Sequence, residues 1–129
     1  MKTSADTSPL LIDKQDGITT LTMNTPERLN GWTMAMMNAL KDAFKLAAAD
    51  EQTSVLILTG ADPYYCAGVN LAATLKLGHP RKLRAMIDEQ NRALFDMFLD
   101  FPKPLLVAVN GPAIGASVTS ATLCDGIIA

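Results

Sequence analysis

Two short turns of small residues are the places in this sequence where chemistry could occur. The first turn reads CAGV (residues 66–69), and the second turn reads NGPAIGA (residues 110–116). Each precedes a predicted helix, whose first backbone N–H groups lack partners within the helix and lie at its positive end. Two such turns that converge could hold one oxygen atom between two N–H donors, as an oxyanion hole does. Small residues suit this role because a ligand must reach the backbone, and here they are Ala67, Gly68, Gly115, Ala116 and Ser117.

The same arrangement occurs twice along the chain. Strands buried on both faces are predicted at residues 55–59 and 105–109, about 50 residues apart, and each leads through its turn into a helix. Repeats of this kind imply stacked parallel strands with helices packed outside, so an α/β fold is expected. The alternative for either turn alone is purely structural, because a glycine after a buried strand is usually a turn residue. The pattern leaves both interpretations open.

The flanking segments supply the remaining predicted elements. Residues 1–9 are predicted to be a flexible tail, and residues 10–14 and 18–24 to form a hairpin that turns at Asp16 and Gly17. A helix is predicted from Thr33 to about Ala49, with one apolar face made of Met36, Met37, Leu40, Ala43, Phe44 and Ala47. Three further helices are predicted: a short one capped by Asn70, one from Pro80 to about Asp100 with Leu83, Ile87, Leu94, Phe98 and Phe101 on one face, and one over residues 115–123.

The composition is that of an ordinary globular protein. Hydrophobic residues make up 49% and charged residues 19% of the 129 residues, and the formal net charge is -2. Charges of mixed sign without a basic stripe argue against nucleic-acid binding. The N-terminal residues lack the apolar core of a signal peptide, and the most apolar long stretch, residues 105–123, is interrupted by Asn110, Gly111, Pro112 and Gly115. No membrane segment is therefore predicted.

The reactive side chains predict no metal site. Cys66 and Cys124 lie in apolar or small-residue surroundings, and His79 is the only histidine, so no group has the spacing of metal ligands. Reduced thiols in an intracellular compartment are the favoured interpretation, with pairing of the two cysteines as the alternative. Carboxylates on loops and helices are expected to be solvated, namely those of Asp62, Asp88, Glu89, Asp96 and Asp100.

The sequence resembles the crotonase superfamily, the enoyl-CoA hydratase/isomerase fold, in the linked segments YYCAGVNL and FPKPLLVAVNGPAIGASVTSATLCDGIIA. The segment PERLNGWTMAMMNAL also fits the first helix region of that family. The resemblance runs from about Leu10 to Ala129 and is strongest to Δ3,Δ2-enoyl-CoA isomerases of peroxisomal type. It implies a crotonase-like spiral of repeated β-β-α units, incomplete in this chain. Residues 10–129 would be the N-terminal part of an acyl-CoA-binding core.

The resemblance also implies an acyl-CoA substrate and assigns the site. The thioester oxygen would lie between the backbone N–H groups of Val69 and Ala116, which form the oxyanion hole. The loop at Arg28 and Leu29 would flank the CoA moiety, although a solvated loop charge is the alternative for Arg28. The pocket around the CoA and the thioester would be lined by Ala67, Gly68, Asn70, Leu71 and Gly115.

Two departures from the family pattern bear on the reaction. Asn70 stands where many members have aspartate, and asparagine can still cap a helix. Thr119 stands where hydratases carry their first catalytic glutamate, and a threonine cannot serve as the base that activates water. The expected reaction is therefore the shift of a 3-enoyl-CoA double bond to the 2 position in fatty acid β-oxidation. The glutamate that moves the proton would lie beyond Ala129, so we expect the isolated 129-residue chain to lack isomerase activity.

The remaining expectations follow from the resemblance alone. No metal or redox cofactor is expected, because coenzyme A is part of the substrate. A homotrimer or hexamer is expected, in a peroxisome, with mitochondrion and cytoplasm as alternatives. The alternative functions are another crotonase-type acyl-CoA enzyme, such as an enoyl-CoA hydratase, or a non-catalytic acyl-CoA-binding module.

Overall fold

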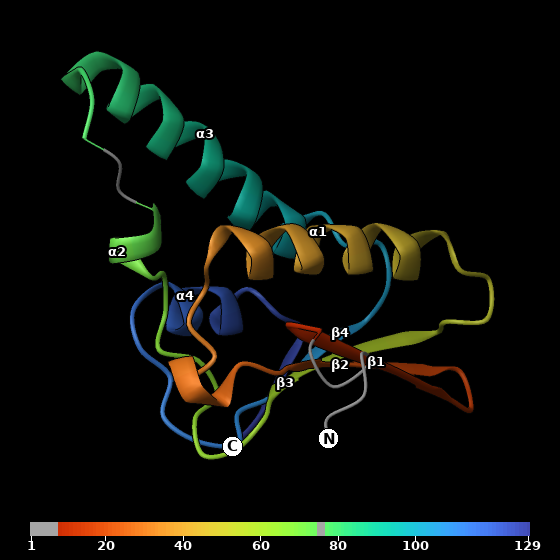
Figure 1. Ribbon diagram of the computed structural model, residues 1–129. Helices are drawn as coiled ribbons and strands as arrows, with labels where there is room; N and C mark the ends of the chain where they lie inside the picture. Colours follow the sequence, from red (N-terminus) through yellow and green to blue (C-terminus); the bar gives the residue numbers. More distant parts are fainter. Residues whose placement is uncertain (1–7, 75–76) are drawn as a thin grey trace.

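A five-stranded sheet carries helices on one side in the computed structural model, which describes residues 8–74 and 77–129 (Figure 1). Residues 1–7 of the predicted tail lie outside the described residues. The strands lie in sequence order, with β1 antiparallel to β2 and the others parallel. The elements are β1 (Leu10–Gln15), β2 (Ile18–Met23), η2 (Pro26–Arg28), α1 (Met34–Ala49), β3 (Val55–Gly60), α2 (Leu71–Thr74), α3 (Pro80–Leu99), β4 (Leu105–Ala108), α4 (Ala116–Thr122) and β5 (Gly126–Ile128).

The predicted hairpin is confirmed, including its turn. Gln15 pairs with Ile18, so Asp16 and Gly17 form a two-residue connection. Both turn residues have positive φ, 52° for Asp16 and 80° for Gly17. Aspartate followed by glycine is the sequence that such a turn favours, because its twist matches that of the two strands.

The predicted first helix is also confirmed. The Thr33 side chain caps α1 by accepting a hydrogen bond from the Met36 N–H at 3.2 Å. All six residues of the predicted apolar face are buried. Phe44, on this face, packs edge-on against Phe98 at the end of α3, with ring centroids 5.1 Å apart. This face joins α1 to the sheet and to α3.

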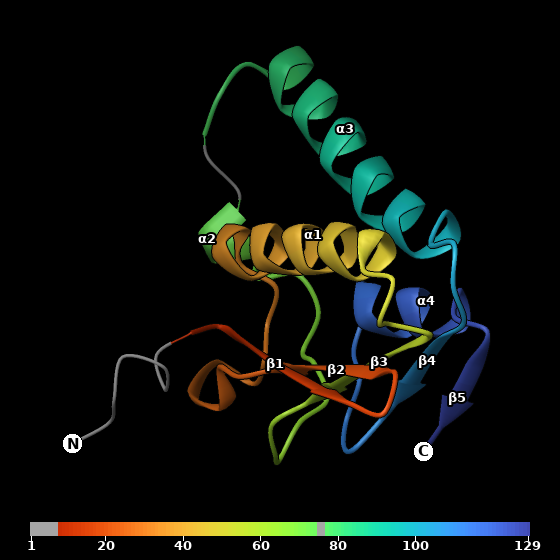
Figure 2. The same cartoon turned by 90° about the vertical axis from the view of Figure 1, so that its right-hand side faces the viewer.

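The prediction that the central strands are buried on both faces is wrong. Along β3 the side chains of Leu56 and Leu58 are fully buried, whereas Val55 and Ile57 are half-buried. β4 alternates in the same way. The reason is visible in Figure 2, where α1, α2, α3 and α4 lie on one side of the sheet and none of these described helices covers the other side. A continuous apolar run predicts a strand, but it does not show whether other elements of the same chain cover one or both faces of the sheet.

The two predicted strand–turn–helix repeats are present. After β3, residue Cys66 forms an isolated parallel bridge with Ala113, which lies after β4. A second isolated bridge pairs Trp32 with Val69. In each repeat, a strand of the sheet is followed by one or two bridge residues and then by a helix. The bridge between Cys66 and Ala113 places the two turns next to each other.

The third helix differs from its prediction in how far it is buried. Only Leu94 and Phe98 of α3 are buried, whereas Leu83 and Ile87 are half-exposed. The C-terminal part of α3 packs on α1, and its N-terminal part extends beyond the body of the molecule (Figure 1). His79 caps the helix by accepting a hydrogen bond from the Arg81 N–H at 3.3 Å.

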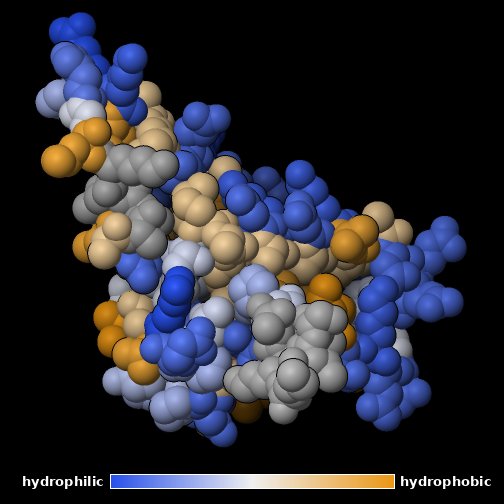
Figure 3. Space-filling model, in the orientation of Figure 1, coloured by the Kyte–Doolittle hydropathy of each residue, from blue (hydrophilic) through white to orange (hydrophobic). Residues whose placement is uncertain are grey.

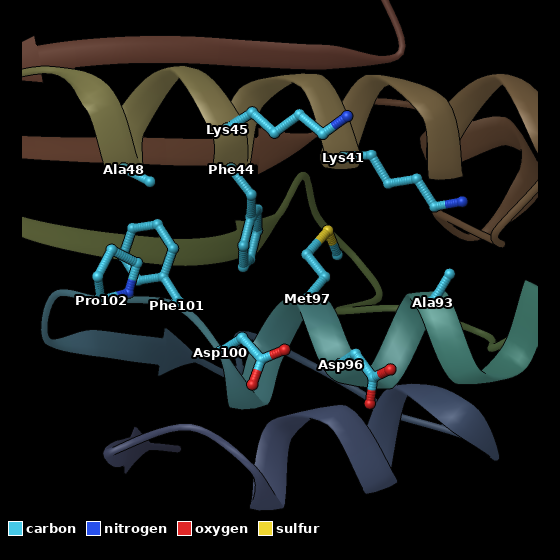
Figure 4. Close-up of a pocket in the computed structure, with 10 residues that line it drawn as sticks. All are labelled: Lys41, Phe44, Lys45, Ala48, Ala93, Asp96, Met97, Asp100, Phe101 and Pro102. Carbon is cyan, nitrogen blue, oxygen red and sulfur yellow. The ribbon is translucent and has the colours of Figure 1, made fainter.

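The α1–α3 groove is an open hollow of about 410 Å³ between these two helices (Figure 4). Its floor includes Phe44 and Met97. Lys41 and Lys45 come from α1, Asp96 comes from α3, and Asp100 directly follows α3. The groove contains none of the predicted site residues. Figure 3 shows mainly hydrophilic residues at the tip of α3. Within the described ranges, no helix is long and apolar enough to cross a membrane.

Truncation of Leu40 tests the packing of α1. Leu40 is fully buried, whereas Leu46 on the same helix is 66% exposed. We expect Leu40→Ala to lower the free energy of unfolding by about 2–5 kcal/mol, because it leaves a cavity in the core. The matched control Leu46→Ala is expected to change it by no more than about 0.5 kcal/mol. Unfolding in denaturant measures both changes. An equal loss of unfolding free energy in the two variants would contradict the burial of Leu40 in the core.

Candidate active site

The two turns meet along their backbones. The Ile114 N–H donates to the carbonyl of Cys66 at 3.0 Å, and the N–H groups of Tyr65 and Cys66 lie 3.2 and 3.3 Å from the Pro112 carbonyl. β3 and β4 are adjacent parallel strands, so the chain leaves both at the same edge of the sheet. The sheet register therefore brings together two segments that are about 50 residues apart in sequence.

Gly68 leaves no room for a side chain between the turns. Its φ is +84°, and a Cβ atom placed on it would lie 2.5 Å from the Ile114 carbonyl oxygen and 3.7 Å from the Ala116 nitrogen. A side chain at this position would collide with backbone atoms that cannot rotate away. The glycine is therefore required by its contact with the second turn as well as by its own conformation.

Val69 and Ala116 line the same cavity, which we call the turn cavity. Its volume is about 230 Å³. Among the described residues, no hydrogen-bond acceptor is found for the N–H of Val69 or of Ala116. The backbone groups on either side of the Val69 N–H are hydrogen-bonded. The Trp32 N–H donates to the Gly68 carbonyl, and the Asn70 N–H donates to the Trp32 carbonyl. Two backbone donors without an acceptor among the described residues thus border one cavity.

The other predicted site residues lie at different distances from the turn cavity. Leu71 lines it. Gly68, Asn70 and Gly115 are chain neighbours of lining residues, whereas Ala67 lies two positions before Val69. Gly115 has φ 63° and ψ -127° immediately before α4. The loop with Arg28 and Leu29 does not line the cavity, but it lies beside the first turn, because the Ala67 N–H donates to the Leu29 carbonyl at 3.0 Å.

Asn30 holds this loop in place and was not predicted. Its side chain is fully buried and donates to the carbonyls of Ala61 and Tyr64 at 2.7 and 2.8 Å. Its side-chain oxygen accepts from the Thr25 N–H at 2.9 Å. Asn30 also has a positive φ of 53°, which asparagine tolerates better than most residues. The signal in the sequence is an asparagine followed by glycine, which predicts a turn but not these contacts.

The far wall of the turn cavity was also missed by sequence reasoning. It is built by Met37 of α1 and by five residues of α3, namely Met86, Ile87, Gln90, Asn91 and Phe95. The α3 residues recur at helical spacing on the part of the helix that does not enter the core. That spacing was available in the sequence, but nothing in it distinguished a cavity wall from a core face. No aspartate or glutamate among the described residues lines this cavity.

Two buried polar groups lie beside the first turn. The Cys66 sulfur accepts from the Gly68 N–H at 3.3 Å, and burial raises the pKa of this thiol to about 11. The thiol is therefore neutral at physiological pH and is not a nucleophile. The Tyr65 hydroxyl is buried with no hydrogen-bond partner among the described residues, and burial raises its pKa. Both groups therefore act as packing groups here.

Substitution of Gly68 tests the contact between the turns. Gly68 and Gly115 both have positive φ, but a Cβ atom on Gly115 would meet nothing within 4 Å. Alanine at either position incurs a backbone cost of about 1–3 kcal/mol. We expect Gly68→Ala to destabilise the protein by a further margin, because only this variant forces the two turns apart. Chemical denaturation compares the two variants, and equal losses would argue against a close contact at Gly68.

The cysteines give a test that depends on pH. Burial raises the pKa of Cys66 and of Cys124 from 9.0 to about 11. Deprotonation therefore favours the unfolded chain, so stability is retained below about pH 9 and falls as the pH rises towards 11. At neutral pH both thiols should react with iodoacetamide much more slowly in the folded chain than in denaturant. Rapid alkylation of Cys66 in the folded chain would contradict its burial.

The comparison with protein families matches the enoyl-CoA hydratase/isomerase model over residues 13–129. Peroxisomal enoyl-CoA delta isomerase 3 of Mus musculus is 33% identical over 125 residues, which are 96% of this chain and 39% of that protein. The 2,3-dehydroadipyl-CoA hydratase of Escherichia coli is 32% identical over 122 residues, 95% of this chain and 46% of that protein.

The fold comparison agrees with the sequence comparison. A probable enoyl-CoA hydratase from Mycobacterium thermoresistibile superposes with a TM-score of 0.83 at 28% identity, covering 92% of this chain and 48% of that one. The chain thus spans less than half of each of these relatives. Because the family model covers nearly the whole chain and the solved neighbour has the crotonase fold, this chain belongs to the enoyl-CoA hydratase/isomerase family.

Proposed function

We propose that this chain forms the thioester-activating part of an enoyl-CoA isomerase that acts on unsaturated fatty acyl-CoA. The observation that carries the proposal is the pair of unpaired N–H groups, of Val69 and Ala116, on one cavity. The thioester carbonyl oxygen would accept hydrogen bonds from both. Backbone donors held in place in this way stabilise a developing oxyanion, and the loss of one typically costs about 3–4 kcal/mol.

The reaction follows from this polarisation. A base removes a proton from the carbon next to the thioester carbonyl, and the electron pair moves onto the carbonyl oxygen to give a dienolate. Protonation two carbons further along leaves the double bond at the 2 position. In the dienolate, the negative charge is shared between the thioester oxygen and the two carbons that can accept the proton, and the Val69 and Ala116 N–H groups would stabilise the part on the oxygen. The described residues place no carboxylate in the turn cavity, so the group that carries the proton must come from elsewhere.

The lining of the turn cavity supports an acyl-chain ligand. Met37, Ile87 and Phe95 present apolar surface next to the two donors. An acyl tail there would extend between α1 and α3, while the CoA moiety would pass the loop at Arg28 and Leu29. The predicted contacts of Ala67, Gly68, Asn70 and Gly115 with the thioester and the pantetheine arm belong to this proposal.

The choice of isomerase over hydratase rests on Thr119. This residue is exposed on α4, close in sequence to Ala116, and it lacks the carboxylate that hydration requires at that place. Identity does not separate the two reactions, because the mouse isomerase and the Escherichia coli hydratase are 33% and 32% identical to the chain. Homotrimeric or hexameric assembly, action without a metal or redox cofactor, and a peroxisomal location are further parts of the proposal.

A non-catalytic acyl-CoA-binding role is the second candidate. The turn cavity contains both predicted oxyanion donors but no aspartate or glutamate among the described residues, an arrangement that favours binding without turnover. Isomerisation of a 3-enoyl-CoA by the 129-residue chain would exclude this candidate and would contradict our expectation that the isolated chain is inactive.

Replacement of Ala116 by proline tests the oxyanion hole directly. Ala116 is the first residue of α4, where proline is tolerated, so Ala116→Pro removes one N–H while retaining the helix. The probe is acetoacetyl-CoA, whose enolate absorbs in the near ultraviolet and needs no catalytic base. We expect the chain to shift the bound probe towards the enolate, and the variant to reduce the enolate-to-ketone ratio by about 100-fold.

The control for this experiment is the fold of the variant. Circular dichroism and denaturant unfolding should show that Ala116→Pro retains its helices and unfolds cooperatively. An unchanged enolate signal in a folded Ala116→Pro variant would refute a role for this N–H. If the unmodified chain gives no enolate signal with bound acetoacetyl-CoA, the proposed function itself fails.

A further inference from the structure

Ser117 is a buried polar residue for which the proposed function has no role so far. Its side chain is fully buried. The hydroxyl oxygen lies 3.0 Å from the Cys66 carbonyl oxygen and 2.9 Å from the Ile114 carbonyl oxygen, and it accepts from the Ile114 N–H at 3.0 Å. The contact with Cys66 joins residues 51 positions apart in sequence. Ser117 therefore touches both turns at once.

The hydroxyl has one proton, so its two carbonyl contacts have different consequences. A bond to Ile114 is local and only shapes the start of α4, as serine often does. A bond to Cys66 links α4 to the first turn. Cys66 is in turn connected to the next peptides, because its sulfur accepts from the Gly68 N–H at 3.3 Å. A short chain of contacts thus runs from Ser117 to the peptide between Ala67 and Gly68, one peptide before the one that carries the Val69 N–H.

The position of Ser117 in the sequence gives this link its significance. It directly follows Ala116, one proposed donor, and its partner Cys66 lies in the turn that carries Val69, the other. The Cys66 carbonyl also receives the Ile114 N–H at 3.0 Å, so the backbones remain joined without the serine. The hydroxyl adds a second, side-chain link at the same carbonyl, and this link limits how the two turns can shift or tilt.

We propose that Ser117 is a positioning residue that fixes the separation and direction of the Val69 and Ala116 N–H groups. The inference rests on the proposed function for the importance of that separation, but its structural part concerns the chain without ligand. An oxyanion hole requires donors within about 2.7–3.1 Å of the oxygen, and a displacement of about 1 Å can cost about 100-fold in rate. A smaller displacement is therefore sufficient to impair the site while the fold persists.

Ser117→Ala and the matched control Ser120→Ala separate positioning from stability. Ser120 is also fully buried on α4, but its hydroxyl donates only to the Ser117 carbonyl within the helix, at 3.0 Å. With acetoacetyl-CoA as the probe, we expect Ser117→Ala to lower the enolate-to-ketone ratio of the bound probe by about tenfold. Ser120→Ala should leave the enolate-to-ketone ratio unchanged. Its denaturant midpoint of unfolding should be similar to that of Ser117→Ala.

A second measurement needs no ligand. Backbone amide NMR spectra of the full chain should show that Ser117→Ala shifts the resonances of Gly68 and Val69, whereas Ser120→Ala leaves them in place. Ser117→Thr, which retains the hydroxyl, should restore both the amide positions and the enolate ratio in the fraction that folds.

The two measurements distinguish the possible failures. If Ser117→Ala matches Ser120→Ala in both spectra and enolate ratio, Ser117 is a local structural residue and the inference is overturned. If the unmodified chain forms no enolate, the proposed function fails, and the amide spectra alone then decide whether Ser117 positions the first turn. Amide resonances of Gly68 and Val69 that do not respond to Ser117→Ala would overturn the inference in that case as well.

Discussion

The close backbone contact between residues 66–69 and residues 110–116 is the constraint on which the rest of this structure depends. The contact is possible because Gly68 has no side chain and a φ of +84°, which lets it lie against the Ile114 carbonyl. It is reinforced by the Ile114 N–H bond to Cys66 and by the Ser117 hydroxyl. Two unpaired N–H groups that border one cavity are the direct result. Without this contact, each turn would be an ordinary end of a strand.

The sheet and three polar side chains maintain the contact. β3 and β4 are parallel, with Leu58 opposite Val107, so both turns begin at the same edge. Asn110 donates to Asp62 at 3.1 Å and accepts from the Gly60 N–H at 3.1 Å, which joins the ends of the two strands. Asn30 ties its own loop to the carbonyls of Ala61 and Tyr64. Together with Ser117, these residues stabilise irregular backbone that secondary structure alone does not hold.

Local sequence rules predicted the elements well, because each depends on near neighbours. The Asp16–Gly17 turn, the Thr33 cap and the six-residue face of α1 all follow from short-range chemistry. Features that depend on distant packing were not predictable in the same way. The open side of β3, the half-exposed Leu83 and Ile87, and the cavity wall on α3 are set by what lies opposite them. The contacts of Asn30 and Ser117 depend on residues 31 and 51 positions away.

In the proposed reaction, thioester polarisation and proton transfer are separate tasks, and the Val69 and Ala116 N–H groups would perform the first. Backbone N–H groups perform polarisation without a titrating side chain, and the buried Cys66 thiol stays neutral beside them because its pKa is raised to about 11. A site of this kind stabilises an enolate whatever the enolate does next. Relatives named as an isomerase and as a hydratase resemble this segment to nearly the same extent, at 33% and 32% identity. Under the proposed function, the carboxylates that meet the enolate would therefore decide the outcome of the reaction, and Thr119 supplies no carboxylate at its position.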